Sequence, residues 1–210
     1  MTENFIKSLL YSKLMKKEFI LKLLSLRKEW KQSELIKLSD STKGHVSKTI
    51  KELEEKNIVT KTDRNTIVVI DLAKLLNYWV SLRELPRPYY LDTKEDIEKI
   101  EQKLKKSYIE YSISFFRAAW HRLKLLKVEK IEIYVLEKDL KRVFRLIGKP
   151  RPYGKVEVYP ATKIDVFGFE KVSGLKLVPV TQNYVDLMLI GGNGTKIALE
   201  LAKKYELFGV

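Results

Sequence analysis

The sequence contains no cysteine and only two histidines, His45 and His121, among its 210 residues. Without cysteine the chain cannot form a disulfide, a cysteine-ligated zinc site or an iron–sulfur cluster, and it has no cysteine nucleophile. Two histidines also fall short of the ligands that a protein-built zinc site normally uses. We therefore expect neither a bound metal nor another cofactor.

Long apolar runs are absent as well. No stretch of about 18 consecutive apolar residues, the length that spans a bilayer, occurs in the chain. Near the N-terminus, Glu3, Lys7 and Lys13 interrupt the hydrophobic residues, which argues against a signal peptide. We expect a cytoplasmic protein that makes no membrane contact.

Positive charge is abundant. The 41 lysine and arginine residues outnumber the 27 aspartate and glutamate residues, so the formal net charge is +14. Such an excess favours a polyanionic partner, most often nucleic acid. The alternative is compositional, because 32 of the basic residues are lysine and heat-adapted organisms have lysine-rich proteins without anionic ligands. The position of the charges has to decide between the two.

Two prolines, Pro86 and Pro88, interrupt the helical pattern near the middle of the chain. Each removes a backbone donor and disfavours helix in the preceding residue. We predict a first domain over residues 1–85, a linker over 86–92 and a second domain over 93–210, in an α+β protein.

Hydrophobic spacing in the first domain predicts helices and a β-hairpin. Helices are expected over residues 32–38, 42–56 and 72–82, after apolar residues at helical spacing between 5 and 24. Two β-branched runs, 58–62 and 66–70, flank Asp63-Arg64-Asn65, where aspartate and asparagine tolerate the backbone of a hairpin tip. This order of elements predicts a winged helix-turn-helix, which places a recognition helix in the major groove of DNA.

The helix over 42–56 is the expected recognition helix. Val46, Ile50 and Leu53 repeat at helical spacing and should face the core, which turns the lysines outward. The residues predicted to contact bases or their surroundings are Lys43, His45, Ser47 and Lys48. Those predicted to contact phosphates are Thr42, Thr49 and Lys51, with Lys61 and Arg64 of the hairpin reaching a flanking phosphate or the minor groove. The alternatives are a merely solvated lysine face and a winged helix that binds only protein.

Strand and helix patterns alternate in the second domain, which predicts a mixed α/β or α+β fold. Strands are expected over 108–113, 130–136, 155–159, 164–167 and 175–180. Helices are expected over 93–105, 114–125, 137–148, 181–190 and 195–205. The strand over 130–136 alternates apolar and polar residues, as a half-buried strand does.

The helix over 137–148 carries a basic stripe, which we define as Lys138, Lys141, Arg142 and Arg145. These positions share one helix face. Residues 117–155 contain 12 basic and 4 acidic residues, whereas the rest of the second domain is balanced. The stripe therefore predicts a surface for DNA, RNA or a protein partner, and the alternative is an ordinary solvated helix face.

Local motifs carry two resemblances. The first domain resembles the winged-helix regulators over residues 33–39, Val46-Ser47 and 53–59. In that superfamily, a helix ending in Leu-Glu-Glu-Lys-Gly leads into the first wing strand. Here Asn57 replaces the glycine. Nearly the whole chain resembles the AbiEi-type antitoxins of type IV toxin–antitoxin systems. The matching pieces are residues 75–79, 111–114, 118–119, 178–187, 191–194 and 198–202, while Ser114-Phe115 stands where the family often has Thr-Gly.

The antitoxin resemblance implies two activities. The winged helix would repress transcription of its own operon by binding double-stranded DNA, and the second domain would neutralise a nucleotidyltransferase toxin. The sequence leaves two roles open for the first helix: Phe5, Leu9 and Leu10 either pair the subunits of a homodimer or pack within their own domain. The alternative function is a protein-interaction module that neutralises or scaffolds a partner without specific DNA binding.

Enzymatic readings are weaker. Residues 191–194, Gly-Gly-Asn-Gly, lack the ending of a Walker A loop and the spacing of a dinucleotide fingerprint, so a tight turn is the better interpretation. A metal-dependent nuclease would need clustered carboxylates and a lysine, but Asp139, Glu157 and Asp165 are scattered and Tyr159 stands where the lysine would be. We expect no catalytic site.

Overall fold

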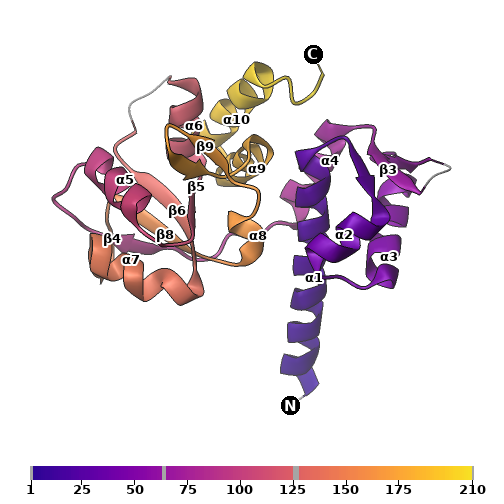
Figure 1. Cartoon of the computed structure of the whole chain (residues 1–210), viewed down its shortest axis with the longest axis horizontal. Helices are drawn as coiled ribbons and strands as arrows, with labels where there is room; N and C mark the ends of the chain where they lie inside the picture. The colour runs from indigo at the N-terminus through magenta and orange to yellow at the C-terminus, as the bar shows by residue number, and fades with distance from the viewer. Residues whose placement is uncertain (1, 63–64, 125–127, 210) are drawn as a thin grey trace. The chain divides into compact units, whose positions relative to one another are not determined.

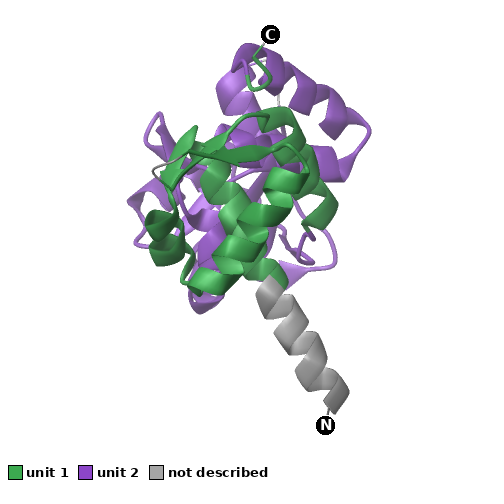
Figure 2. Cartoon of the chain, turned by 90° about the vertical axis from the view of Figure 1, so that its right-hand side faces the viewer, with its two compact units in different colours: residues 1–83, 207–210 green, residues 84–206 purple. Residues whose placement is uncertain are grey.

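The computed structural model describes residues 2–62, 65–124 and 128–209, with side chains from Leu14 onward. The chain is a mixed α+β protein with two compact units, coloured separately in Figure 2. Unit 1 comprises residues 1–83 and 207–210, and unit 2 comprises residues 84–206. Within the described residues, no helix combines the length and the apolarity needed to cross a bilayer.

Unit 1 combines helices with a three-stranded antiparallel sheet of order β1-β3-β2 (Figure 1). Its elements are α1 (Thr2–Leu26), β1 (Glu29–Lys31), α2 (Gln32–Ser39), α3 (Lys43–Glu55), β2 (Val59–Lys61), β3 (Thr66–Val69) and α4 (Leu72–Leu82). The expected helices over 32–38, 42–56 and 72–82 and the expected hairpin are confirmed. Strand β1 was not expected, because three residues are too short for a recognisable alternation.

Apolar residues from all four helices and the sheet form the core of unit 1. Ile20 and Leu24 of α1, Leu35 of α2, and Val46 and Ile50 of α3 are almost completely buried. Trp79 of α4 is also buried, and its indole Nε1 donates to the Glu18 carboxylate at 3.1 Å. Arg83 forms a buried ion pair with the same carboxylate. The buried carboxylate of Glu18 is thus paired, as a buried charge requires.

Unit 2 is built around a seven-stranded mixed sheet of order β7-β4-β8-β6-β5-β10-β9. Pairs β6–β8 and β5–β10 are parallel and the other pairs are antiparallel. Its elements are β4 (Tyr89–Leu91), α5 (Ile97–Lys106), β5 (Tyr111–Ile113), α6 (Phe115–Leu123), β6 (Ile131–Leu136), the 3₁₀ turn η1 (Glu137–Asp139), α7 (Leu140–Ile147), β7 (Pro150–Arg151), β8 (Val156–Ala161), α8 (Lys163–Val166), β9 (Glu170–Val172), β10 (Leu175–Leu177), α9 (Val180–Ile190) and α10 (Asn193–Lys204).

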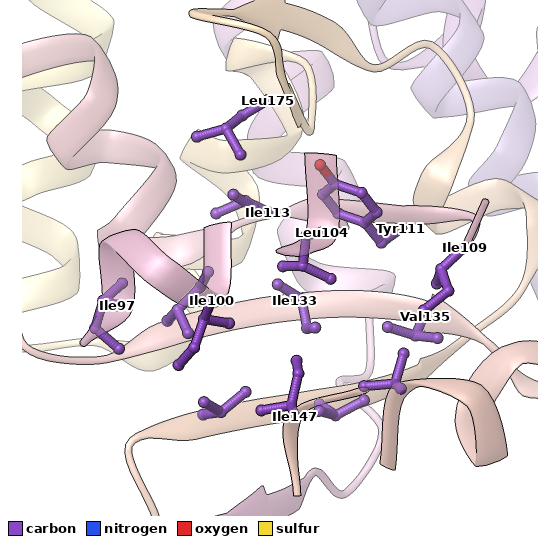
Figure 3. Close-up of a cluster of buried hydrophobic side chains, with 14 of the residues drawn as sticks. Ile97, Ile100, Leu104, Ile109, Tyr111, Ile113, Ile133, Val135, Ile147 and Leu175 are labelled. Carbon is purple, nitrogen blue, oxygen red and sulfur yellow. The ribbon is translucent and has the colours of Figure 1, made fainter. Parts of the chain in front are cut away.

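The two faces of this sheet differ in chemistry. Ile133 and Val135 of β6 point to an aliphatic cluster with Ile100 and Leu104 of α5 (Figure 3). Because side chains alternate along a strand, Glu132 and Tyr134 point the opposite way, toward α6. Strand β6 is buried on both faces, so the expectation of a half-buried strand was wrong. A central strand with helices on both sides leaves no face for solvent.

Three expectations for the second domain differ from the structure. The expected linker contains β4, because the prolines that end the helical pattern are followed by strand-forming Tyr89-Tyr90-Leu91, which pair with β7 and β8. The expected strand over 164–167 is helix α8, because Thr162 and Asp165 form a capping box at its start. The last residues, from Leu207, group with unit 1 rather than with the second domain.

Candidate nucleic-acid interface

Helix α3 has one buried and one exposed face. Its buried residues are Val46, Thr49, Ile50 and Leu53, and they fix the helix against the core of unit 1. The helix begins after Thr42, whose side chain accepts a hydrogen bond from the His45 N–H at 3.2 Å. Such an N-cap stabilises a helix start by about 1 kcal/mol. The exposed face begins at this capped end, which is the end that a recognition helix presents.

Three lysines stand on the exposed face of α3. Lys43, Lys48 and Lys51 are exposed, and none of them forms an ion pair with any residue in the described part of the chain. Gly44 lies between them, and a Cβ atom placed there would meet nothing within 4 Å. No carboxylate occurs between Lys43 and Lys51. This face therefore offers uncompensated positive charge and an unobstructed approach to the backbone.

The polar residues beside these lysines are more constrained. Ser47 is half-buried, and its hydroxyl accepts a hydrogen bond of 2.7 Å from the Gln32 side chain of α2. His45 is also half-buried. Thr42 is exposed, but its oxygen already caps the helix. These three predicted contact residues lie at the surface of α3, while part of their hydrogen-bonding capacity serves the fold.

The structure contradicts the prediction for Thr49. It was expected to contact a phosphate, but only 3% of it is exposed. Residue 49 follows Val46 by three positions and precedes Leu53 by four, so the helical repeat puts it on the buried face. The assignment of Thr49 to DNA was wrong for that reason.

Lys61 is the basic residue of the hairpin that the structure describes. Lys61 at the end of β2 is exposed, and its Nζ lies 3.3 Å from a carboxylate oxygen of Glu54 in α3. This ion pair compensates part of its charge. Arg64, the other predicted contact of the hairpin, lies outside the described residues. Within the described residues, the hairpin therefore offers less uncompensated positive charge than α3.

A hollow of about 400 Å³ adjoins the start of α3. It is lined by Lys31 and Gln32 at the start of α2, by Lys43, and by Asn65 of the hairpin. The first backbone N–H groups of a helix attract anions. Lys31, Gln32 and Asn65 were missed as candidates, although the start of the predicted helix over 32–38 was a signal for the first two.

A polar network holds α3 in place. Lys17 of α1 donates to Glu52 of α3 at 2.8 Å and to the Tyr78 hydroxyl of α4 at 2.6 Å. Burial alone would raise the pKa of Glu52, but the hydrogen bonds from Lys17 and Tyr78 outweigh burial and lower that pKa below its usual value. The carboxylate is thereby kept ionised and paired. It does not offset the charge of the α3 lysines.

The basic stripe runs from η1, which contains Lys138, into α7, and half of its residues form ion pairs. Lys138 lies 2.7 Å from Glu110, and Arg142 lies 2.8 Å from Asp139. Lys141 and Arg145 are exposed without an ion-pair partner in the described part of the chain. The fold brings Glu110 from another segment to Lys138, and Asp139 stands one helical turn before Arg142, so two of the four cations have acidic partners that the helical spacing did not indicate.

Two other basic residues of the positively charged stretch 117–155, Arg117 and Arg122, are buried inside unit 2. The Arg117 side chain is 1% exposed and its Nε donates to Glu101 at 2.7 Å. Arg122 is equally buried and its guanidinium donates to Glu170 at 2.7 Å and to Asn183 at 3.1 Å. The local excess of positive charge between residues 117 and 155 is therefore not a surface property throughout.

The carboxylates considered for catalysis have structural partners. Asp165 caps α8, and Asp139 accepts a hydrogen bond from the Glu110 backbone at 3.2 Å. Glu157 accepts from the Tyr159 hydroxyl at 3.0 Å and pairs with Lys130 at 3.2 Å. Among the described residues, no three acidic or histidine side chains come together as metal ligands would.

Glu132 was missed by the sequence patterns. It is 4% exposed in β6, and its carboxylate accepts a hydrogen bond of 3.2 Å from the Arg117 backbone N–H. Burial, with the charge of Glu157 nearby, raises the pKa of Glu132 to about 8 despite that hydrogen bond. The side chain therefore stays protonated at neutral pH.

The glycine-rich turn joins α9 to α10. Gly191 and Gly192 have left-handed φ values of 71° and 52°. A Cβ atom on Gly194 would lie 2.4 Å from the Leu187 carbonyl oxygen, so the two helices require glycine there. The prediction of a tight turn is confirmed.

No known protein-family model matches this chain, and none of the curated proteins matches it.

Proposed function

We propose that unit 1 is a winged helix-turn-helix and that the protein is a sequence-specific transcription regulator that binds double-stranded DNA. Helix α3 would enter the major groove, and the β2–β3 hairpin would be the wing beside it. The element order α1-β1-α2-α3-β2-β3 and the three-stranded sheet support this assignment.

The observation that carries the proposal is the exposed face of α3. Lys43, Lys48 and Lys51 point away from the buried face of α3, and none of them forms an ion pair within the described residues. Lysines placed in this way can neutralise phosphates or reach base edges. The open backbone at Gly44 lets the helix approach a duplex closely.

The proposal does not extend to toxin neutralisation, which rests on sequence resemblance alone. The competing function is a module that binds only protein. It predicts no preference among DNA sequences, whereas a regulator must bind its own site far better than other DNA, by about 10³-fold or more at physiological salt.

Fluorescence anisotropy with duplexes that tile the region upstream of the gene tests the proposal. One duplex should bind at least about 10³-fold more tightly than a scrambled duplex of equal composition. The triple substitution Lys43→Glu, Lys48→Glu and Lys51→Glu should abolish that preference while the circular dichroism spectrum stays unchanged.

The matched control is Lys99→Glu, Lys171→Glu and Lys196→Glu, which changes the net charge equally at exposed positions of unit 2. It should retain the preference for the specific duplex. Equal weakening by both triple variants, or no preferred duplex, would reject the regulator in favour of the protein-binding module.

A further inference from the structure

Unit 1 contains a second hollow, of about 800 Å³, away from the exposed face of α3. Its walls are the end of α1 with residues 27–28, the junction of β3 and α4, and the C-terminal residues Leu207–Gly209, all of which belong to unit 1. Leu207 is buried, so the end of the chain is packed in unit 1 as one wall of the hollow. This volume lies in the range of cavities that bind small molecules.

The walls combine apolar side chains with polar groups, and eight of the thirteen lining residues are apolar. Leu26, Leu72 and Phe208 line the hollow and are half-exposed. Ile70 is the most exposed of the aliphatic residues there, at 54%. A large aliphatic side chain left open at the mouth of a cavity is covered favourably by an apolar ligand.

The charges that line the hollow leave one cation uncompensated. Arg27 pairs with Glu34 at 2.6 Å, and Asp71 caps α4 and pairs with Lys74 at 3.3 Å. The hydrogen bond from the Lys74 backbone contributes most to lowering the pKa of Asp71 below its usual value. Lys28 is exposed, and its side chain has no partner in the described part of the chain. The lining thus combines apolar side chains with polar groups and carries a net charge of +1.

We propose that this hollow is a binding site for a small apolar molecule with one negative group, such as a carboxylate or a sulfonate. The apolar body contacts Ile70, Leu72 and Phe208, and the anionic group pairs with Lys28. The site is independent of the proposed DNA contacts, because it shares no residue with the exposed face of α3.

Anilinonaphthalene sulfonate, a fluorescent apolar monoanion, is a direct probe. The intact protein should bind it saturably, and decanoate should displace it. Ile70→Glu puts a second acid beside Asp71 and should weaken probe binding by at least about tenfold. The matched control is Leu199→Glu on α10, because Leu199 is 52% exposed and lies in unit 2.

A charge-only variant separates the two parts of the site. Lys28→Gln should weaken binding of both the probe and decanoate, but the dissociation constant of the uncharged decanol, obtained by competition and corrected for the affinity of the probe, should stay unchanged. Absence of saturable binding, equal weakening by Ile70→Glu and Leu199→Glu, or an unchanged affinity in Lys28→Gln would overturn the proposal.

Discussion

The two units use positive charge differently. The first 85 residues contain 17 basic and 11 acidic residues, and the remainder contains 24 and 16, so both halves are similarly basic. In unit 1, α3 exposes three lysines without ion-pair partners among the described residues. In unit 2, Arg117 and Arg122 are buried in ion pairs, and half of the α7 stripe is paired. A basic stretch of sequence therefore becomes a cationic surface only where the fold brings no acid to it.

The largest expected effect is the loss of stability when a buried cation of unit 2 is removed. Arg117→Ala should destabilise unit 2 by about 3 kcal/mol, because it breaks the buried ion pair with Glu101 and leaves that carboxylate with His121 Nε2, at 2.6 Å, as its remaining partner. Lys48→Ala in unit 1 should change stability by less than about 0.5 kcal/mol, because its side chain is exposed. Urea denaturation of both variants provides the measurement, and similar losses would show that the two cations are not used differently.

The buried carboxyl group of unit 2 predicts a pH effect. The pKa of Glu132 is raised from 4.5 to about 8 in the folded chain, so the unfolded state loses its proton first as pH rises. This group therefore stabilises the fold least above pH 8, and its full contribution is present only below about pH 4.5. Glu132→Gln removes the titration while it keeps an oxygen for the Arg117 N–H.

The stability of Glu132→Gln relative to the parent should consequently rise between pH 5 and pH 8.5, by an amount on the order of a few kcal/mol. Denaturation series at these two pH values measure the difference. A constant difference would mean that Glu132 titrates near its ordinary pKa and is not a buried acid.

Charge reversal compares the two helices directly. Lys48→Glu with Lys51→Glu in α3 should weaken binding to the specific duplex by about 30-fold or more, since two phosphate or base contacts become repulsive. Lys141→Glu with Arg145→Glu in α7 should weaken it by less than about threefold, as expected for a long-range change that salt screens. A larger loss of affinity in the α7 variant than in the α3 variant would mean that unit 2, and not α3, contacts the duplex.

The smallest effect concerns the start of α3. Thr42→Ala removes the cap on the His45 N–H and should cost about 1 kcal/mol of stability, whereas Thr42→Ser should retain it. Thermal unfolding distinguishes the two variants. Equal stabilities of the two variants would mean that the Thr42 side chain does not stabilise the start of α3.

Local patterns in the sequence predicted α2, α3 and α4 well, because apolar spacing and a capping residue determine an amphipathic helix within a few turns. Short edge strands such as β1, β7 and β9 were missed, since two or three residues carry no periodicity. The strand expected over 164–167 failed because a capping box outweighs β-branched residues over so short a segment.

Helical spacing predicts some features of the candidate interface, and contacts between distant segments determine the others. The outward position of Lys48 and Lys51 followed from helical spacing, and the same spacing, applied to Thr49, would have shown that it is buried. The pairing of Lys138 with Glu110 links residues 28 positions apart, and that of Arg122 with Glu170 links residues 48 apart. Such contacts depend on the tertiary fold, so the sequence pattern alone predicted more uncompensated positive charge on the basic stripe than the structure shows.

The salt dependence of binding to the specific duplex tests the central claim most directly. Each neutralised phosphate contributes roughly 0.9 to the slope of log Kd against log salt, so the three α3 lysines account for up to about 2.7 of it when each of them lies against a phosphate. Replacement of Lys43, Lys48 and Lys51 by glutamine should lower the slope by that amount, while Lys141→Gln with Arg145→Gln leaves it unchanged. A slope that is flat in the parent, or equal in all three proteins, would contradict the account.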